Sequence, residues 1–271
     1  MNSFDYRRAE RVADAVAWLR EEPEAKLLAG GQSLLAAIKL GLAAPPLLID
    51  LARIAELRQL QLQGNALWIG AMCSHAVVAA SPLVRQHLPG LAALAGHIAD
   101  QQVRNRGTLG GSIANADPAA CWPAGVLAAG ATLVTDRREI AAEVFFQGLF
   151  STALEPDKLL LGARFPLGQQ LAYRKEEQPA SRFALAGVAV ARDAAGAVRV
   201  AVTGLGSGAV RWAEAEAALQ RRWAPEALAG LRPDADLAGG DLHASADYRL
   251  HLAGVVARRV VLALSNPETV R

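Results

Sequence analysis

Apolar residues recur at helical spacing near the start of the chain and predict its first elements. Between residues 8 and 21 they occupy every third or fourth position, at Val12, Ala15, Val16 and Leu19. Pro23 ends this pattern. A short apolar strand is predicted at residues 26–29, followed by the pair Gly30–Gly31 and a helix that begins near Ser33. We therefore expect an amphipathic helix and then the order strand, glycine turn, helix.

Strand and helix patterns continue to alternate between residues 45 and 95. After Pro45–Pro46, the run LLIDL predicts a short buried strand. The stretch LRQLQLQGNALWIGA then predicts two strands joined by a Gly-Asn turn. Residues 81–95 predict a helix that is interrupted near Pro89. The first half of the chain is therefore interpreted as mixed α/β.

The second half begins with the same alternation of helices and strands and then continues with strands followed by helices. The run AGVLAAGATLVT predicts a helix that passes into a strand, and LLLGARFP predicts a strand that stops at Pro166. Beyond Gly168, the segments AYRKE, RFALAGVAVAR and AVRVAVTGLG predict three strands, and AEAEAALQRRW and DYRLHLAGVVARRVVLAL predict helices. We expect two domains, residues 1–168 and residues 169–271, the second an α+β domain.

Composition narrows the class of protein. The chain has 271 residues, of which 52% are hydrophobic and 20% are charged, and this excludes a disordered or collagen-like chain. Lys and Arg number 28 and Asp and Glu number 26, so the net charge of +2 predicts no nucleic-acid partner. Cys73 and Cys121 form no CxxC pair, which argues against an iron–sulfur cluster or a Cys-rich zinc site in this chain.

Targeting and membrane signals are weak. The N-terminal sequence MNSFDYRRAERVADAV has early acidic residues and no uninterrupted apolar core, unlike a secretory signal. The longest uncharged run, residues 118–135, contains prolines and glycines and has polar ends, and the run AGVVARRVVLAL is broken by two arginines. We expect a cytoplasmic protein without membrane insertion.

Two glycine-rich segments are the candidates for chemistry. The first, Ala29–Leu34, lies between a predicted strand and a predicted helix, and the second is Thr108–Ser112. Glycines let the backbone approach a ligand closely, and unpaired N–H groups in such loops bind phosphate. Alone, each is also explained as a tight turn, with Ser33 as a helix N-cap in the first and Asn115 and Asp117 capping the turn that follows the second. Together, two loops converging on one dinucleotide diphosphate make a more specific hypothesis.

Other motifs give weaker evidence for a binding or catalytic site. The segment Gly204–Ala209 superficially fits the GxGxxA of a Rossmann site, but no second parallel strand follows it, so a plain turn is favoured. Cys73 and His75 are near neighbours without a third orienting group, and structural roles are expected for both. The histidines show no metal-ligand spacing. Arg104 and Arg106 suggest surface ion pairs or the docking of an acidic partner.

Several motifs together resemble a known family. The segments AGGQSLL, IGAMCSHA, QVRNRGTLGGSIANADPAA, SRFALAGVAVAR and DLHASADYRLHLAGVVARR, in this order, are similar to the FAD-binding medium subunit of the molybdenum hydroxylases. This group includes aerobic carbon monoxide dehydrogenase, xanthine dehydrogenase and bacterial N-heterocycle dehydrogenases. The resemblance covers essentially the whole chain. It implies an FAD-binding domain of the vanillyl-alcohol-oxidase (PCMH) type, followed by a carbon monoxide dehydrogenase flavoprotein C-terminal domain with a three-stranded antiparallel sheet and helices.

The resemblance also implies which residues hold FAD. Both glycine segments fall on stretches that bind the diphosphate and adjoining groups, Ile98 matches a position near the flavin ring, Leu160 lies in a contacting segment, and Arg174 matches a position that often offers a cation. The implied cofactor-binding residues are Leu27, Leu28, Ala29, Gly30, Gly31, Gln32, Ser33, Leu34, Ile98, Thr108, Leu109, Gly110, Gly111, Ser112, Asp117, Cys121, Leu160 and Arg174.

One position departs from the family pattern. Relatives commonly carry a second Asp that contacts FAD where this chain has Cys121. A thiol is a poor hydrogen-bond acceptor, so this contact is weakened or replaced, and Cys121 either adjusts the flavin or simply packs. Packing is the favoured interpretation.

The family also implies a division of labour. A large molybdopterin subunit would hydroxylate the substrate, a small subunit with two [2Fe–2S] clusters would relay electrons, and this chain would pass them through FAD to an acceptor, in a dimer of heterotrimers. No catalytic side chain and no metal site are expected here. Two alternatives stay open: a stand-alone flavin reductase of the same superfold, and a cofactor-free assembly subunit. The sequence names neither the organic substrate nor the electron acceptor.

Overall fold

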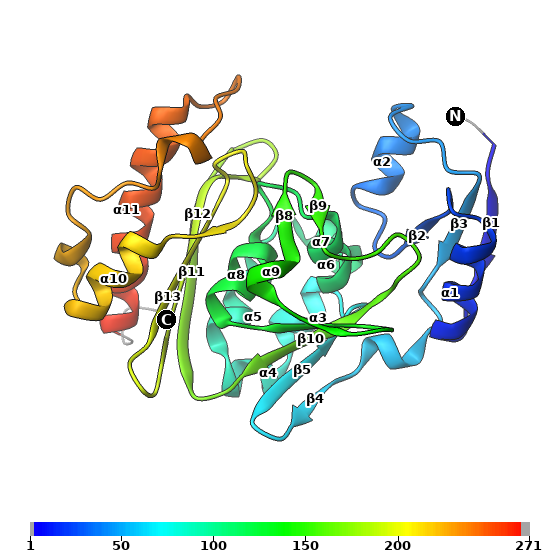
Figure 1. The fold of residues 1–271 in the computed structure, drawn as a ribbon, viewed down its shortest axis with the longest axis horizontal. Coiled ribbons are helices and arrows are strands. Elements are labelled where there is room, and N and C mark those ends of the chain that lie inside the picture. The colour runs from blue at the N-terminus through cyan, green and yellow to red at the C-terminus, as the bar shows by residue number, and fades with distance from the viewer. Residues whose placement is uncertain (1–2, 267–271) are drawn as a thin grey trace.

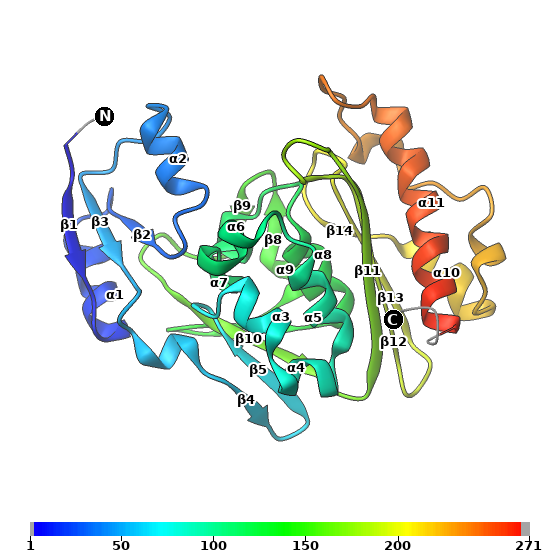
Figure 2. The ribbon, with the colours of Figure 1, turned by 180° about the vertical axis from the view of Figure 1, so that it is seen from behind.

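The computed structural model describes residues 3–266, so residues 267–271, at the end of the expected second domain, lie outside the described residues. The chain forms three parts in a row (Figures 1 and 2). An N-terminal part lies at one end, a central part follows, and the C-terminal part lies at the other end. No helix among residues 3–266 combines the length and the apolar character needed to cross a bilayer.

The N-terminal part is a small parallel sheet covered by a helix. Its strands are β1 (Asp5–Arg8), β2 (Lys26–Leu28) and β3 (Leu47–Asp50), in the order β1-β3-β2, and its helices are α1 (Val12–Glu21) and α2 (Leu34–Lys39). Buried Ala15, Val16 and Leu19 of α1 pack in one core with Leu47 and Ile49 of β3. The expected helix over residues 8–21 begins only at Val12, because residues 5–8 pair with β3 as a strand that the apolar pattern did not reveal.

The central part is a five-stranded antiparallel sheet with helices on one face. The strands are β4 (Leu60–Gln63), β5 (Ala66–Gly70), β10 (Leu160–Pro166), β6 (Thr132–Thr135) and β7 (Glu139–Ala141), in that order across the sheet. Most helices of this part lie between this sheet and the C-terminal sheet (Figure 1). The smaller elements are η1 (Ala55–Arg58), α3 (His75–Ala80), α4 (Pro82–His87), α5 (Pro89–Gly96), α6 (Gln101–Arg106), α7 (Leu109–Asn115), α8 (Cys121–Ala129), α9 (Ala142–Phe145), β8 (Phe146–Gly148) and β9 (Ser151–Thr152).

The expected elements of this region are confirmed. The β4–β5 hairpin turns at the Gly-Asn pair, and the helix expected over residues 81–95 divides into α4 and α5 at Pro89. All nine residues of α8 are buried, because this helix is packed between two sheets. Its uniformly apolar sequence fits that position, since a helix that is apolar on every side must be covered on every side.

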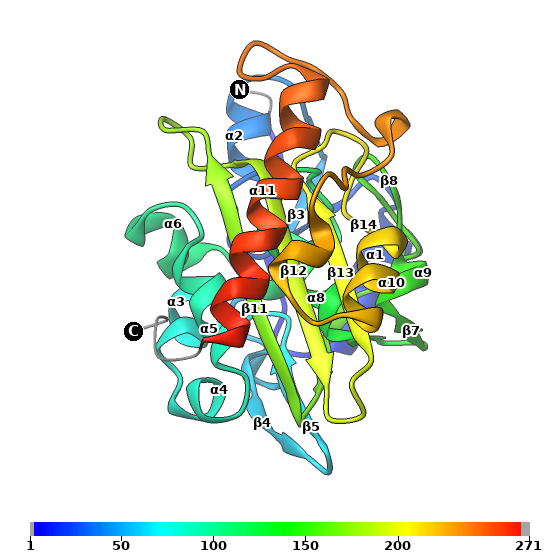
Figure 3. The ribbon, with the colours of Figure 1, turned by 90° about the vertical axis from the view of Figure 1, so that its left-hand side faces the viewer.

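The C-terminal part is an antiparallel sheet with helices on its outer face (Figure 3). The strands β11 (Gln169–Glu177), β12 (Ala184–Asp193), β13 (Val198–Thr203) and β14 (Val210–Arg211) lie in chain order. The other elements are α10 (Ala213–Arg221), η2 (Pro225–Leu228), η3 (Ala235–Leu237) and α11 (Ala246–Ser265). The expectation of three strands is wrong by one, because β14 has only two residues and gives no apolar pattern. The Gly204–Ala209 segment joins β13 to β14 as an irregular connection in which Gly206 forms an isolated bridge with Ala238.

The C-terminal sheet shares its inner face with the central part. On β12, Val188 and Val190 face the core formed with α10 and α11, whereas Ala189 and Ala191 belong to the core that contains α5 and α8. Small alanines on the inner face allow α8 to lie close to the strands. The turn at Gly168, with φ of +75°, joins β10 to β11 where the domain boundary was expected, yet the larger core extends across it.

Candidate functional site

A large cleft lies where the three parts of the molecule meet (Figure 1). Its volume is about 660 Å³, within the usual range of small-molecule and cofactor pockets. Lining residues come from β2 and the turn after it, from α6 and α7 with the loops around them, from the segment that precedes β10, and from the loop between β11 and β12. The cleft therefore depends on segments that are far apart in the sequence.

The first glycine segment provides free donors at the edge of this cleft. Gly31 has φ of +72° and begins the turn from β2 into α2. The backbone N–H groups of Gly31, Gln32 and Ser33 have no hydrogen-bond partner among the described residues. Ser33 occupies the N-cap position of α2, but its hydroxyl makes no capping hydrogen bond. The sequence-based interpretation of Ser33 as a side-chain cap is therefore wrong. Successive free N–H groups of this kind suit an anion.

The second glycine segment differs from the donor-rich loop that the sequence suggests. Thr108 is the N-cap of α7, and its Oγ1 accepts a bond of 3.0 Å from the Gly111 N–H. The N–H groups of Leu109 and Gly110 donate to the carbonyls of Cys73 and Ala71, at 3.0 and 2.8 Å. The expectation of a loop with free donors is therefore wrong here. What this segment offers the cleft is a surface without β-carbons and the Thr108 and Ser112 side chains.

The two glycine segments lie directly against each other. A β-carbon built on Gly30 would lie 2.3 Å from the carbonyl oxygen of Arg106 and 2.7 Å from Gly107 Cα. A β-carbon on Gly111 would lie 3.4 Å from Ala29 Cβ. Because the first of these contacts is with backbone, only glycine fits at position 30. The structure thus confirms that the two segments converge on one cleft.

Most of the residues expected to bind FAD line this cleft. They are Leu27, Ala29, Gly30, Gly31, Gln32, Ser33, Leu34, Ile98, Thr108, Gly110, Gly111, Ser112, Asp117, Cys121 and Leu160. Three others do not line it: Leu28 is the last residue of β2, Leu109 is fully buried in the core below α7, and Arg174 is exposed on β11.

Lys175, and not Arg174, lines the cleft. Successive side chains of a strand point to opposite faces, and Lys175 is on the cleft side of β11 whereas Arg174 is on the side of α11. The Lys175 side chain is only 5% exposed. Its ammonium donates to the Arg182 carbonyl and lies 3.5 Å from a carboxylate oxygen of Glu177. The alternation along AYRKE, in which buried Tyr173 shares a face with Lys175, is the sequence signal that would have identified it.

The turn formed by residues 117–121 covers another side of the cleft. Asp117 Oδ1 accepts a 2.8 Å bond from the Ala119 N–H, and burial raises the pKa of this carboxyl group. Burial also raises the pKa of the Cys121 thiol, which is therefore neutral. Cys121 lines the cleft and is also part of the larger core, near Tyr173. It therefore adds no negative charge to the cleft.

His75 has the structural role that was expected for it, through contacts that the sequence did not indicate. The indole N–H of Trp122 donates to His75 Nδ1 at 3.0 Å, and the backbone N–H of His75 donates to the Gly107 carbonyl at 2.9 Å. His75 thus connects α8 to the turn before the second glycine segment. Burial and the nearby charge of Arg104 lower its pKa to about 4, so the imidazole is neutral and its proton resides on Nε2.

The neutral state of His75 predicts a specific pH dependence of stability. Because its pKa is about 4 in the folded chain and about 6.5 when unfolded, protonation favours the unfolded state. Its contribution is complete above pH 6.5 and is lost between pH 6.5 and 4, with a total of about 3 kcal/mol. Denaturant unfolding of the wild type and of His75→Gln across this range measures the difference. If the unfolding free energy of the two proteins changed with pH in parallel, the assignment of a neutral His75 would be contradicted.

Cys73 takes no part in a nucleophilic pair with His75. Its thiol donates to the Arg58 carbonyl at 3.4 Å, and burial raises its pKa to about 11. This confirms the structural role expected for it. Arg104 donates to the carbonyls of Ile98 and Ala99 and so stabilises the loop before α6. Residues 3–266 contain no cluster of three side chains suited to a metal ion.

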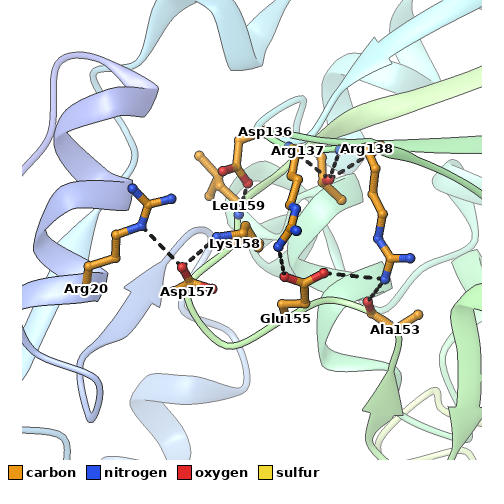
Figure 4. Close-up of polar contacts among 10 residues, drawn as sticks. Arg20, Asp136, Arg137, Arg138, Ala153, Glu155, Asp157, Lys158 and Leu159 are labelled. Carbon is orange, nitrogen blue, oxygen red and sulfur yellow. Dashed lines mark hydrogen bonds and ion pairs between the residues drawn. The ribbon is translucent and has the colours of Figure 1, made fainter.

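A charged network ties the segment before β10 to its neighbours on both sides (Figure 4). Glu155 lies between Arg137, at 2.9 Å, and Arg138, at 3.6 Å, both from the turn between β6 and β7. Asp157 lies 3.2 Å from Arg20 of α1 and 2.5 Å from Lys158. Since Glu155 and Lys158 line the cleft, the network keeps this wall in place between the N-terminal and central parts.

Comparisons with known proteins agree with this architecture. Residues 2–168 match the family model described as the FAD binding domain in molybdopterin dehydrogenase, and residues 171–264 match the CO dehydrogenase flavoprotein C-terminal domain. The chain is 37% identical to the carbon monoxide dehydrogenase medium chain of Hydrogenophaga pseudoflava, over 96% of each chain. It is 34% identical to the nicotine 6-hydroxylase medium subunit of Paenarthrobacter nicotinovorans, over 95% of each.

A solved structure of the carbon monoxide dehydrogenase from Hydrogenophaga pseudoflava superposes with a TM-score of 0.87, covering 97% of both chains. Quinoline 2-oxidoreductase from Pseudomonas putida 86 superposes with a TM-score of 0.86 at 30% identity. The family models match most of the described sequence, and the fold agrees with these structures from end to end. The chain therefore belongs to the family of FAD-binding medium subunits of the molybdenum hydroxylases, which are oxidoreductase components.

Proposed function

We propose that this chain binds FAD in the cleft and acts as the electron-transfer flavoprotein subunit of a heteromeric molybdenum hydroxylase. Electrons would come from [2Fe–2S] clusters of a partner subunit and leave through FAD to an external acceptor. The observation that carries the proposal is the contact of Gly30 with Arg106 and Gly107, which brings the two glycine segments into one cleft.

The residues present fit the cofactor. The free N–H groups of Gly31, Gln32 and Ser33 would hold the diphosphate, which supplies the acceptors that these donors lack. Across from them, the β-carbon-free surface of Gly110 and Gly111 leaves room for a close approach. Such a site needs few charges, because donors at fixed positions already favour an anion.

The rest of the cleft would set the surroundings of the flavin ring. Ile98 and Leu160 supply apolar surface, and Lys175 supplies a buried positive charge. The bound flavin would provide the redox chemistry, so the chain has to position it, shield it and adjust its potential. His75 and Cys121 are both neutral and add no charge near it.

We propose that the partners are a large molybdopterin subunit and a small subunit with two [2Fe–2S] clusters, in a cytoplasmic dimer of heterotrimers. The medium chains among the relatives support this, since their names place them in multi-subunit enzymes. The cofactors other than FAD would then belong to the partner subunits. The organic substrate would be bound outside this chain.

Purification of the chain alone tests the proposal. We expect about one FAD per chain, measured by absorbance, with oxidised-flavin bands that bleach on reduction. The isolated chain should not oxidise an organic substrate. NADH oxidation by the chain without partners would favour a stand-alone flavin reductase, and a folded chain that takes up no flavin under any condition would favour an assembly subunit instead.

A further inference from the structure

The turn over residues 117–121 is bonded to the C-terminal sheet at three successive carbonyl groups. The carbonyl of Pro118 accepts from the Gly204 N–H at 2.7 Å and from the Thr203 hydroxyl at 2.8 Å. The Ala120 carbonyl lies 2.9 Å from the same hydroxyl and shares its single proton with the Pro118 carbonyl. Thr203 therefore connects two carbonyls of one turn.

The carbonyl between them is bonded in the same way. The Ala119 carbonyl accepts from the Ala184 N–H, the first residue of β12, at 3.4 Å. The N–H groups of Ala119 and Ala120 donate to Asp117, at 2.8 and 3.0 Å. The carbonyls of residues 118–120 and the N–H groups of residues 119 and 120 thus all have partners, and the three carbonyls are directed toward the C-terminal part.

The orientation of these carbonyls matters because the turn lines the cleft. Asp117, Ala119, Ala120 and Cys121 all contribute to the cleft surface. A carbonyl oxygen carries partial negative charge, so a turn that rotated its carbonyls into the cleft would repel the diphosphate and the other electron-rich groups of FAD. Bonds to the sheet hold that charge away from the cleft.

Thr203 is the one side chain that makes these bonds, and it is fully buried. It is the last residue of β13 and lies on the same face of that strand as Ala201, toward α8. Without its hydroxyl, the turn would lose its side-chain bond to β13, while the Pro118 carbonyl would keep the Gly204 N–H and the Ala120 carbonyl, at the N-cap of α8, would keep the first bond within that helix. Only backbone bonds would then hold the turn to the C-terminal sheet, and its carbonyls would be freer to rotate toward the cleft.

We propose that Thr203 is a positioning residue for FAD. Thr203 holds the turn over residues 117–121 in place, and through this residue the C-terminal part shapes the cofactor cleft. This inference rests on the proposed function. Thr203 does not line the cleft, so it would act through the turn and not through the cofactor.

Three variants of Thr203 test the inference. Thr203→Val keeps the shape and removes the hydroxyl, Thr203→Ser restores the hydroxyl, and Thr203→Cys supplies a weaker donor. FAD affinity is measured by fluorescence titration of the apoprotein, together with the visible spectrum of the bound flavin. We expect Thr203→Val to weaken FAD binding about tenfold, Thr203→Ser to stay within about twofold of wild type, and Thr203→Cys to lie between them.

A matched control separates positioning from general loss of stability. Val200 is fully buried on the same strand but faces the core with α10 and α11. Val200→Ala should lower the unfolding temperature and leave FAD affinity unchanged. If Val200→Ala weakens FAD binding as much as Thr203→Val does, or if Thr203→Ser fails to restore it, the inference is overturned.

The proposed function and this inference fail in different ways. If the wild type binds FAD and Thr203→Val binds it equally well, with the same spectrum, only the role of Thr203 is refuted. If the folded wild type takes up no FAD, the proposed function fails and this inference fails with it. Should Thr203→Val not fold, the comparison of Thr203→Cys with Thr203→Ser decides the matter by the same measurements.

Discussion

A Gly111→Asp protein is expected to fold and to retain no FAD. A β-carbon at this position would lie 2.9 Å from Thr108 Oγ1 and 3.4 Å from Ala29 Cβ, so the new carboxylate would stand between the two glycine segments. Its charge would face the diphosphate that these segments are proposed to hold. At a few ångströms and an effective dielectric constant near 20, this repulsion is about 3 kcal/mol, equivalent to a more than hundredfold loss of affinity.

The control for this variant is Gly96→Asp. Gly96 is exposed at the end of α5, and a β-carbon there would meet only Ala79 Cβ, at 3.9 Å. The Gly96→Asp substitution adds the same charge outside the cleft, so the flavin content of this variant after purification should match that of the wild type. Full flavin content in Gly111→Asp would show that the diphosphate is bound elsewhere.

A Gly90→Ala protein is expected to lose about 3 kcal/mol or more of unfolding free energy, because α5 and β11 would have to separate. A β-carbon on Gly90 would lie 1.9 Å from the carbonyl oxygen of Leu171 and 2.6 Å from its carbonyl carbon. Backbone on both sides of this contact leaves no side chain to move aside. Denaturant unfolding monitored by circular dichroism measures the loss.

The same helix provides the comparison. Gly96→Ala places its methyl group at 3.9 Å from Ala79 Cβ, an ordinary contact. Because alanine is the better helix former, this variant should match the wild type or gain up to about 1 kcal/mol. Equal stability of the Gly90 and Gly96 variants would show that the contact between α5 and β11 is looser than described.

The sequence predicted those elements whose evidence is local. The β4–β5 hairpin, the break at Pro89 and the succession of α8 and β6 follow from turn residues and apolar periodicity, and the structure confirms them. Residues 5–8 and Val210–Arg211 were missed because neither segment is apolar enough to show a pattern. Residues 5–8 become a strand by pairing with β3, which is distant in the sequence. Val210–Arg211 become one by pairing with β13 across the intervening segment.

The site was predicted in the same uneven way. Glycines at positions 30 and 111 indicated close backbone approach. A β-carbon on Gly30 would meet the backbone of Arg106 and Gly107, just before the second segment, and one on Gly111 would meet Thr108 Oγ1 and Ala29 Cβ. The sequence did not reveal that the donors at the start of α7 are already used by Ala71 and Cys73, since those partners come from another segment. The sequence indicated Arg174 where Lys175 lines the cleft, because a shift of one residue along a strand moves a side chain to the opposite face.

The core that continues across the turn at Gly168 limits how this protein can be divided. Leu171, Tyr173 and the alanines of β12 pack in the same cluster as α5 and α8. A hybrid gene that joined one relative's N-terminal segment to another's C-terminal segment at this turn would combine two halves of a single packed interior. Such an exchange would succeed only if the residues that meet there were exchanged along with it, so the two segments are expected to have diverged in concert.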